Sequence, residues 1–196
     1  MPLRFAIEPQ DGSELVRAGL NRLAARRSHV SMRAVDFSAV QLKPPHAIYD
    51  LRADEIANGA GLASAHATGF RYLVEAPSGT VAAAEVHADA SGRATLLANV
   101  NYGPFVAATA RALDQLAKLN QVRAGSYEVR LLRFSAILLM AIWLKSDTGD
   151  PDIIYPLAPA PDVLQADKPC SADDFLKAIM PVAKARAAKK ASPAVP

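Results

Sequence analysis

Residues 128–144 read E-V-R-L-L-R-F-S-A-I-L-L-M-A-I-W-L, and the place where this apolar surface is buried decides the fold. Its uninterrupted apolar part, 136–144, is bounded closely by Arg133 and Lys145. A helix that spans a membrane needs roughly 20 apolar residues, more than twice what this stretch offers. The sequence therefore excludes a membrane span here and favours a buried element of a water-exposed domain.

Within this stretch the pattern favours strands at about 127–134 and 137–145, with a bend between them. Apolar and charged residues alternate before the bend, as they do in a half-buried strand, and both faces become apolar after it. A helix through 136–144 is the competing interpretation, because Ala, Leu and Met favour helices. Burial inside a sheet is the preferred interpretation of the second strand, and an oligomer interface with Trp143 facing outward is the alternative.

The rest of the chain alternates between helical and strand-like spacing. Three short apolar runs separated by glycine turns predict an antiparallel meander. Pro104 suits the first turn of a helix, Ser171 suits a helix cap, and Pro181 is expected to kink or end the last helix. The expected elements are helices at about 13–27, 54–59, 104–120 and 171–181, and extended segments or strands at about 30–42, 70–75, 80–87, 94–101, 127–134, 137–145 and 152–156.

These elements predict an α+β fold. We expect a mainly antiparallel sheet of five to six strands, with the helix at about 104–120 packed on one face and with N- and C-terminal helices. Residues 1–180 are expected to form a single domain. The remainder, 181–196, is a basic tail rich in Ala, Lys and Pro with little to bury, so it should be mobile unless a partner holds it.

The net charge of +3 conceals an uneven distribution, because the two ends of the chain are basic and residues 36–174 are net acidic. A basic end can hold an acidic protein surface or a phosphate backbone. The candidate partner-binding residues are Arg17, Arg22, Arg26 and Arg27 in the first helix and Lys184, Arg186, Lys189 and Lys190 near the C-terminus.

A single cysteine, Cys170, rules out an internal disulfide framework and favours a reducing, cytoplasmic setting. Acidic residues and prolines interrupt the N-terminus where a signal peptide would be apolar. The high alanine content is typical of a GC-rich bacterial genome. The four histidines do not pair at metal-ligand spacing, so we predict neither a zinc site nor any other cofactor.

Five polar residues on the expected strands are the candidates for catalysis. Glu85 and His87 are two residues apart and should share a sheet face, as should Asn99 and Asn101 on the next strand. If Arg130 shares that face, His87 could act as acid or base, with Glu85 orienting it and the others binding an anion. The alternative is the ordinary wet face of an antiparallel sheet.

No motif in the chain identifies a family or a reaction. The preferred hypothesis is a non-enzymatic accessory protein that binds another protein, or a second copy of itself, through a polar sheet face, its basic terminal segments, or both. One alternative is a small hydrolase or lyase that uses the Glu85–His87 pair. Another is an electrostatic nucleic-acid binder that uses the Arg-rich first helix, although the aromatic side chains of a single-strand binder are missing there.

Overall fold

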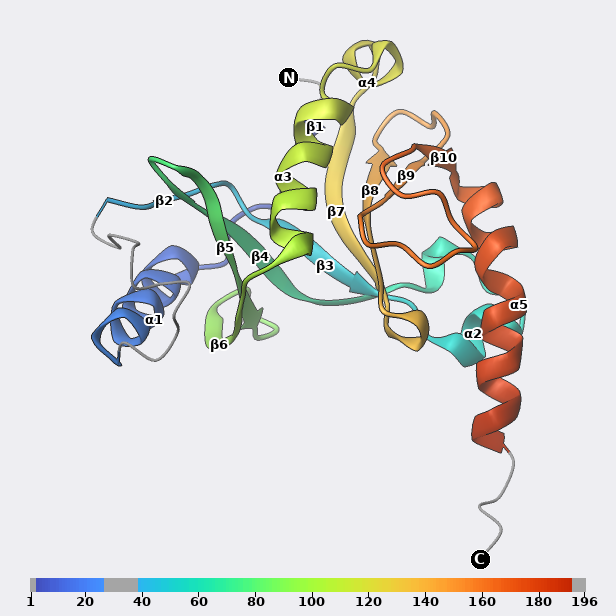
Figure 1. The fold of residues 1–196 in the computed structure, drawn as a ribbon, viewed down its shortest axis with the longest axis horizontal. Helices are drawn as coiled ribbons and strands as arrows, with labels where there is room; N and C mark the ends of the chain where they lie inside the picture. Colours follow the sequence, from blue (N-terminus) through green and yellow to red (C-terminus); the bar gives the residue numbers. More distant parts are fainter. Residues whose placement is uncertain (1–2, 27–38, 192–196) are drawn as a thin grey trace, which may run out of the picture.

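The computed structural model describes residues 3–26 and 39–191, which Figure 1 shows as a ribbon. Within these residues the fold is α+β, as predicted, with ten strands in one mixed sheet and five α-helices. The strands are β1 Leu3–Arg4, β2 Gln41–Leu42, β3 His46–Asp50, β4 His66–Ala76, β5 Gly79–Ala88, β6 Ala94–Asn101, β7 Tyr127–Phe134, β8 Leu139–Ser146, β9 Ile153–Pro156 and β10 Cys170–Ser171. The helices are α1 Gly12–Arg26, α2 Ala53–Ala57, α3 Pro104–Leu116, α4 Asn120–Ala124 and α5 Ala172–Ala191, with short 3-10 helices η2 Leu62–Ser64 and η3 Ser135–Ile137.

The sheet is larger than the sequence predicts, and it is mixed. Its strands follow the order β10-β9-β8-β7-β3-β4-β5-β6, with β1 beside β7 and β2 beside β4. β7 pairs in parallel with β1 and β3, and the other pairs are antiparallel. The prediction of five to six mainly antiparallel strands is wrong because it omits the short strands β1, β3 and β10 and the parallel pairs that β1 and β3 make with β7. β3 is too short to show a period of two, yet it lies between β4 and β7 at the centre of the sheet. Of the extended segment expected at 30–42, residues 30–38 lie outside the described residues.

The apolar stretch at 128–144 forms most of β7, η3 and β8, so the strand interpretation is confirmed over the helical one. Both faces of β8 are apolar because each meets a helix. Ile142 packs in one hydrophobic core with Leu116 of α3, and Trp143 packs in another with Phe175 of α5. Successive side chains of a strand point to opposite faces, so this strand serves two cores at once.

Trp143 lies inside the protein, and the alternative in which it faces outward is wrong. Its side chain is 3% exposed, its ring meets that of Tyr49 edge-on, and its Nε1 donates a hydrogen bond to Asp152 at 2.9 Å. The exposed apolar residue of this region is instead Leu138 in the tight turn before β8. Association with a second copy stays a prediction, for which Trp143 offers no surface.

Helices α1 and α3 cover opposite faces of the part of the sheet formed by β4 and β5. Val16 of α1 packs in a core with Tyr72, whereas Val106 of α3 packs with Leu73, the neighbouring residue on β4. The helix predicted at about 104–120 is thus confirmed on one face of the sheet. Gly19 lets α1 approach β6 closely, since a Cβ there would lie 2.0 Å from the Leu97 side chain.

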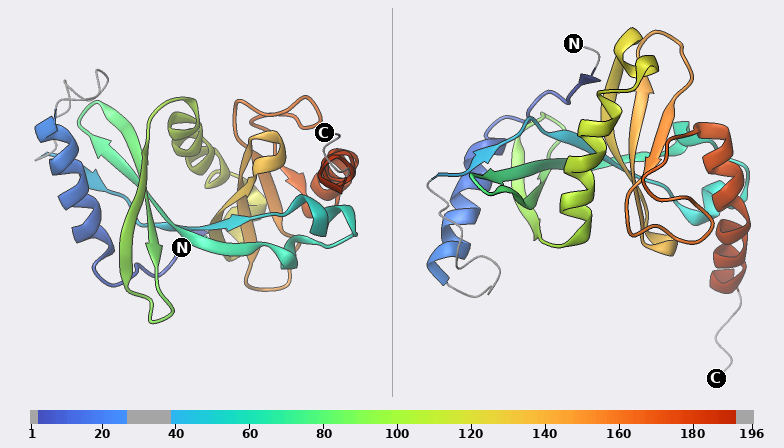
Figure 2. Two further views of the ribbon diagram at one scale, coloured as in Figure 1. Left: turned by 90° about the horizontal axis from the view of Figure 1, so that it is seen from below. Right: turned by 45° about the horizontal axis from the view of Figure 1, so that its top comes forward.

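The C-terminal helix continues beyond Pro181 to Ala191, so the expectation that this proline ends the helix is wrong. Phe175 precedes the proline and Ala183 follows it, and both are buried in the core that includes β8. This packing stabilises the helix on either side of the missing N–H group. Figure 2 shows α5 at one end of the elongated sheet and α1 at the other. The mobility expected for 181–196 stays a prediction.

None of the helices within residues 3–26 and 39–191 combines the length and the hydropathy needed to cross a membrane.

Candidate functional site

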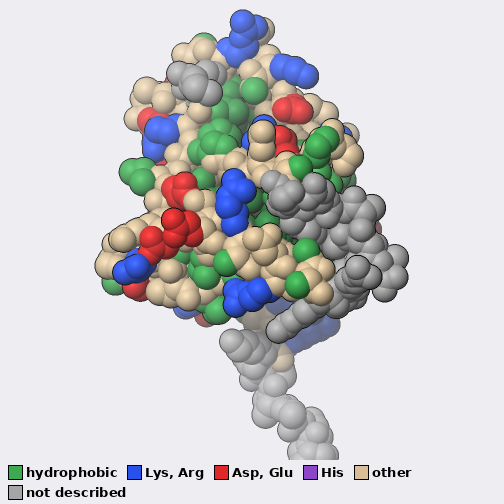
Figure 3. All heavy atoms as spheres, turned by 90° about the vertical axis from the view of Figure 1, so that its left-hand side faces the viewer, with side chains coloured by type: hydrophobic (Ala, Val, Ile, Leu, Met, Phe, Trp, Pro, Cys, Tyr) green, Lys and Arg blue, Asp and Glu red, His purple; other side chains and the backbone are tan. Residues whose placement is uncertain are grey.

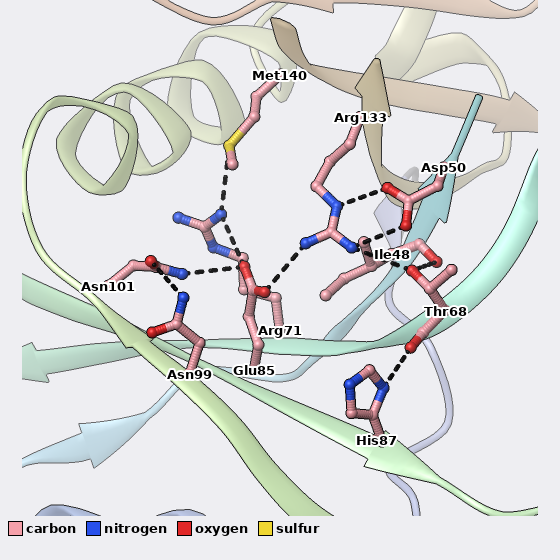
Figure 4. A network of polar contacts seen from close by, with 10 residues as sticks. All are labelled: Ile48, Asp50, Thr68, Arg71, Glu85, His87, Asn99, Asn101, Arg133 and Met140. Carbon is pink, nitrogen blue, oxygen red and sulfur yellow. Dashed lines mark hydrogen bonds and ion pairs between the residues drawn. The ribbon is translucent and has the colours of Figure 1, made fainter. Parts of the chain in front are cut away.

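One connected set of polar contacts crosses six adjacent strands, from β8 to β6, on the sheet face that α3 also covers (Figure 4). The contributing strands are neighbours in space, although Asp50 and Arg133 are 83 positions apart in the chain. The members drawn in Figure 4 are Ile48, Asp50, Thr68, Arg71, Glu85, His87, Asn99, Asn101, Arg133 and Met140. This set is the place where most of the predicted catalytic candidates lie.

Arg133 is the centre of one half of the set. Its Nε and Nη2 atoms bind the two carboxylate oxygens of Asp50 at 2.7 and 2.9 Å, and Nη2 also donates to Thr68 at 3.2 Å. Burial by itself raises the pKa of the Asp50 carboxyl, but the hydrogen bonds and charge of Arg133 outweigh burial and hold that pKa below its ordinary value. Hydrogen bonds to Asp50 in turn raise the pKa of Arg133. This pair is ionised at neutral pH.

Glu85 joins the two halves of the set. One of its oxygens accepts from Arg133 at 3.1 Å, and the other accepts from Arg71 at 3.4 Å and from Asn101 at 3.1 Å. Arg71 is completely buried, and burial lowers the pKa of its guanidinium while Glu85 counteracts that effect. Two arginines and the two carboxylates Asp50 and Glu85 balance in charge, so the set is internally neutralised.

His87 lies at the edge of this set, away from the Glu85 carboxylate (Figure 4). Its Nδ1 lies 2.7 Å from the backbone oxygen of Thr68, and Glu85 is bound instead to arginine and asparagine side chains. The two residues are two positions apart on β5, but their side chains have separate partners. In this arrangement Glu85 does not orient the imidazole, and the hydrolase or lyase alternative stays a prediction.

Arg130 lies on the other face of β7 from Arg133 and takes no part in the set. Its guanidinium stands over the rings of Tyr49 and Trp143, with 4.5 and 4.7 Å from its central carbon to the ring centroids, and it donates to Glu128 at 2.6 Å. Such stacking stabilises a partly buried arginine. The structure therefore brings Glu85 together with the two predicted asparagines and leaves Arg130 in a structural position.

Sequence reasoning missed Asp50 and Arg133, and it noted Arg71 on the first strand of the meander without pairing it with Glu85. Arg71 and Arg133 stand on predicted strands, but their partner strand β3 was not predicted. The available signal was a charge in each of two apolar strands, because a charge in such a strand is rarely left without an opposite one. That signal predicts that residues of opposite charge lie nearby, but it does not say which residues they are.

The set reaches the protein surface through the two asparagines of β6. Asn99 donates to the side chain of Asn101 at 3.0 Å, and Asn101 donates to Glu85. Asn99 also lines an open groove of about 610 Å³ between α1 and β6. The hydrogen bond from Asn101 to Glu85 thus connects the ion pairs to β6, which forms one wall of the groove.

The groove runs along the outer edge of β6 and not over one face of it. Its lining includes every residue from Thr95 to Val100 in succession, whereas a groove on a single face would touch alternate residues. Within the described residues β6 is the last strand of the sheet and pairs on one side only, with β5. At its start, Gln10 accepts a hydrogen bond from Ala94, and this contact closes that end of the edge.

The side chains of this edge are unusual for an open strand. Natural edges are protected by charged side chains or proline, and Ala94–Asn101 contains neither. Leu96 is 55% exposed. Two register shifts in the pairing with β5 give β6 two extra residues, which increase its twist and interrupt its regular edge. The edge is therefore partly protected by shape, and it is not protected by charge.

The positive charge beside the groove comes from arginine side chains of α1. Arg22 is the charged member of its lining, and Arg17 lies exposed on the same helix, where it donates to the Val40 carbonyl at 3.4 Å. The Arg26 side chain and Arg27 lie outside the described residues. Figure 3 faces the side of the molecule on which α1 lies in Figure 1, and Lys and Arg side chains, Asp and Glu side chains and small hydrophobic patches are all spread over it.

The basic residues near the C-terminus do not join this surface. Lys184, Arg186 and Lys189 are exposed on α5, at the opposite end of the sheet from α1 (Figure 1), and the Lys190 side chain lies outside the described residues. The two groups of predicted partner-binding residues therefore lie on two separate helices at opposite ends of the sheet.

Comparison with known proteins adds no relative to this picture. No family model matches the chain, no curated protein matches it, and no solved structure matches it.

Proposed function

We propose that this protein is a non-enzymatic accessory domain that binds an extended, acidic segment of a partner protein along the edge of β6. The observation that carries the proposal is the groove that follows this uncharged strand edge beside α1. An extended peptide that adds to an open edge gains backbone hydrogen bonds, and pockets beside the edge select its side chains.

The residues that line the groove favour a partner segment with both apolar and acidic side chains. Leu15 and Leu23 of α1 and Leu97 of β6 offer apolar contacts, and Arg22 is positive with no acidic residue in the lining. Because the outer side of β6 is limited to about Leu96 to Asn101 by Gln10, the added segment is short. A short apolar segment carrying Asp or Glu satisfies these conditions.

The test is a selection of peptides of about seven residues, a common strand length, from a randomised library on the immobilised full-length protein. We expect enriched peptides to combine apolar residues with at least one acidic residue. Leu96→Asp should weaken their binding by about tenfold or more, because it removes an apolar contact and adds a repelling charge. Leu138→Asp is the matched control, since Leu138 is also an exposed leucine but lies outside the groove.

A second pair of variants tests the charge. Arg22→Glu should weaken binding and reduce its dependence on salt, whereas Arg186→Glu on α5 should leave both unchanged. Equal loss from Arg22→Glu and Arg186→Glu, or retained binding in Leu96→Asp, would contradict the proposal. So would a dimer that Leu96→Asp dissociates, since a second copy would then occupy the edge.

A further inference from the structure

A second pocket, of about 490 Å³, lies between α3 and the sheet, and it shares no lining residue with the β6 groove. Its walls come from five parts of the chain that meet only in the folded protein. The volume falls within the roughly 300–1,000 Å³ that is typical of small-molecule sites. The pocket is therefore large enough to hold a small organic molecule.

The pocket lies where the sheet divides. β3 pairs with both β4 and β7, but before β3 the neighbours separate, with β2 continuing along β4 and β1 along β7. Pro44 and Pro45 occupy the position of the division, and neither has an N–H group with which to extend a strand ladder. Figure 1 shows β7 leading away from β4 and β5 with α3 across the division. The topology thus leaves a space that α3 covers.

The walls of this pocket are mainly apolar. Ala110 and Leu113 come from α3 and Leu73 from β4, while Phe5 and Pro44 come from the segments that follow β1 and precede β3. Phe5, Ala110 and Leu113 are only partly buried, so part of their apolar surface is available to a ligand. Removing such surface from water is favourable, and these walls therefore favour a ligand with an apolar body.

Asp114 lies on the same face of α3 as the apolar residues of the pocket. Ala110, Leu113 and Asp114 have the spacing of three and four residues that makes side chains neighbours on a helix surface, and all three line the pocket. Asp114 is exposed, and its carboxylate forms no ion pair or hydrogen bond with the residues that the structure describes. The lining thus includes a carboxylate without a cationic partner.

The two other charged residues of the lining are paired with each other. Nζ of Lys43 lies 2.8 Å from a carboxylate oxygen of Glu75, and both side chains are partly exposed. Together with Asp114 the lining has one cationic and two anionic side chains, so its net charge is negative. A negative lining attracts a cation, and an ammonium group offers three donors to a carboxylate. Because Asp114 is exposed, the ammonium group also keeps contact with water.

We propose that this pocket binds a small primary amine with an apolar or aromatic body, whose ammonium group pairs with the carboxylate of Asp114. The body lies against the apolar side chains of α3 and β4. An alcohol of the same shape keeps the apolar contacts and loses the ion pair, and a carboxylic acid meets a lining of its own charge. Affinity therefore falls in the order amine, alcohol, acid. The site is independent of the β6 edge and of any partner bound there.

Naphthylmethylamine, which has a fluorescent aromatic body and an ammonium group at neutral pH, is the probe for this site. We expect saturable one-to-one binding to the full-length protein in a fluorescence titration, weaker binding of naphthalenemethanol and the weakest binding of naphthaleneacetate. Asp114→Asn, which keeps the size and removes the charge, should weaken binding of the amine by about twofold to fivefold and leave binding of the alcohol unchanged. Asp162→Asn is the matched control, because Asp162 is also an exposed aspartate and does not line the pocket.

Two tryptophan substitutions test the location of the site. Ala110→Trp fills the pocket and should abolish binding of the amine. Ala98→Trp places the same side chain in the β6 groove and should leave binding of the amine unchanged. Because Ala98→Trp should instead impair peptide binding, the two proposals succeed or fail separately.

Absence of saturable binding of the amine to the wild-type protein would overturn the proposal. So would equal affinity of the amine for the wild-type protein and Asp114→Asn, or equal binding to Ala110→Trp. If Ala110→Trp does not fold, Asp114→Lys decides, since lysine is a good helix former at an exposed helical position. This variant should bind naphthaleneacetate more tightly than the amine, and an unchanged order of affinities is incompatible with the site.

Discussion

At the scale of single residues, Glu85 is the carboxylate on which the buried charges depend. It accepts from Arg133 and from Arg71, and Arg71 is completely buried. Ion pairs of this kind add little net stability, because desolvation offsets their attraction, but removing one partner leaves a buried charge uncompensated. Glu85 therefore offsets the free-energy cost of burying the positive charge of Arg71.

Glu85→Ala should lower the free energy of unfolding by about 3–5 kcal/mol, because it leaves the buried charge of Arg71 without an opposite charge. Urea denaturation monitored by circular dichroism measures this change. Glu75→Ala is the control, since Glu75 belongs to a partly exposed pair with Lys43 and should cost at most about 1 kcal/mol. Similar losses from the two substitutions would show that Glu85 is not an essential counter-charge.

His46 makes stability depend on pH in a definite direction. Its pKa is about 3 in the folded protein and 6.5 in the unfolded chain, so between these values the unfolded chain binds the proton. Stability is therefore lost as the pH falls from about 6.5, by at most about 1.4 kcal/mol per pH unit. Arg71 is the charged group that acts on the imidazole, and Lys43, Glu75 and Asp114 line the same pocket as His46.

The measurement is the unfolding free energy of the wild-type protein minus that of His46→Phe, followed from about pH 7.5 to 4.5. This difference cancels the acid sensitivity of Asp50 and the other carboxyl groups, which both proteins share. We expect the difference to be constant above about pH 7. Below about pH 6 it should decrease, because the wild-type protein loses stability relative to His46→Phe. A difference that stays constant over the whole range would mean that His46 is not buried in its neutral form.

At the scale of elements, β8 connects the two largest cores. Ile142→Ala should cost about 2–5 kcal/mol in unfolding free energy, as for other fully buried aliphatic residues. Leu138→Ala, four residues earlier and 81% exposed, should change it by no more than about 0.5 kcal/mol. Thermal or urea unfolding of both variants gives the comparison. If the cost at Leu138 matched that at Ile142, the assignment of 139–146 to a two-sided strand would fail.

The sequence predicted those elements whose local pattern is complete. β6, α3, β7 and β8 have clear periods, turns or caps, and each lies within a few residues of its predicted place. It could not predict β3, because five residues between a proline pair and a short helix carry no readable period. The parallel pairing of β3 with β7, the division of the sheet and the polar set around Arg133 all follow from that strand, so they were missed together.

The helix ends show a second limit of local reasoning. Pro181 was expected to kink or end the C-terminal helix on its intrinsic preference, but Phe175 and Ala183 are buried in one core on either side of it. Tertiary packing overrides local propensity when both halves of a helix have something to bury. The candidate residues fared similarly: alternation placed Glu85 with Asn99 and Asn101, but it could not show that His87 pairs with the backbone oxygen of Thr68 and not with Glu85.

At the scale of the whole molecule, two basic helices lie at opposite ends of a long twisted sheet, and α1 borders the groove along the edge of β6. The polar set that crosses the sheet ends at the asparagines of that edge strand. The same α+β framework therefore supplies a strand edge, a positive charge beside it and a groove with both polar and apolar lining residues. These are the requirements of a surface that receives an extended segment.

Backbone amide exchange of the full-length protein, followed residue by residue with and without a library-selected peptide, tests this account most directly. If a partner strand adds to β6, amides between Leu96 and Asn101 whose N–H groups point outward exchange freely in the free protein and slow by about tenfold or more in the complex. The opposite result would be protection that appears on α5 or elsewhere while the exchange of the β6 amides stays the same.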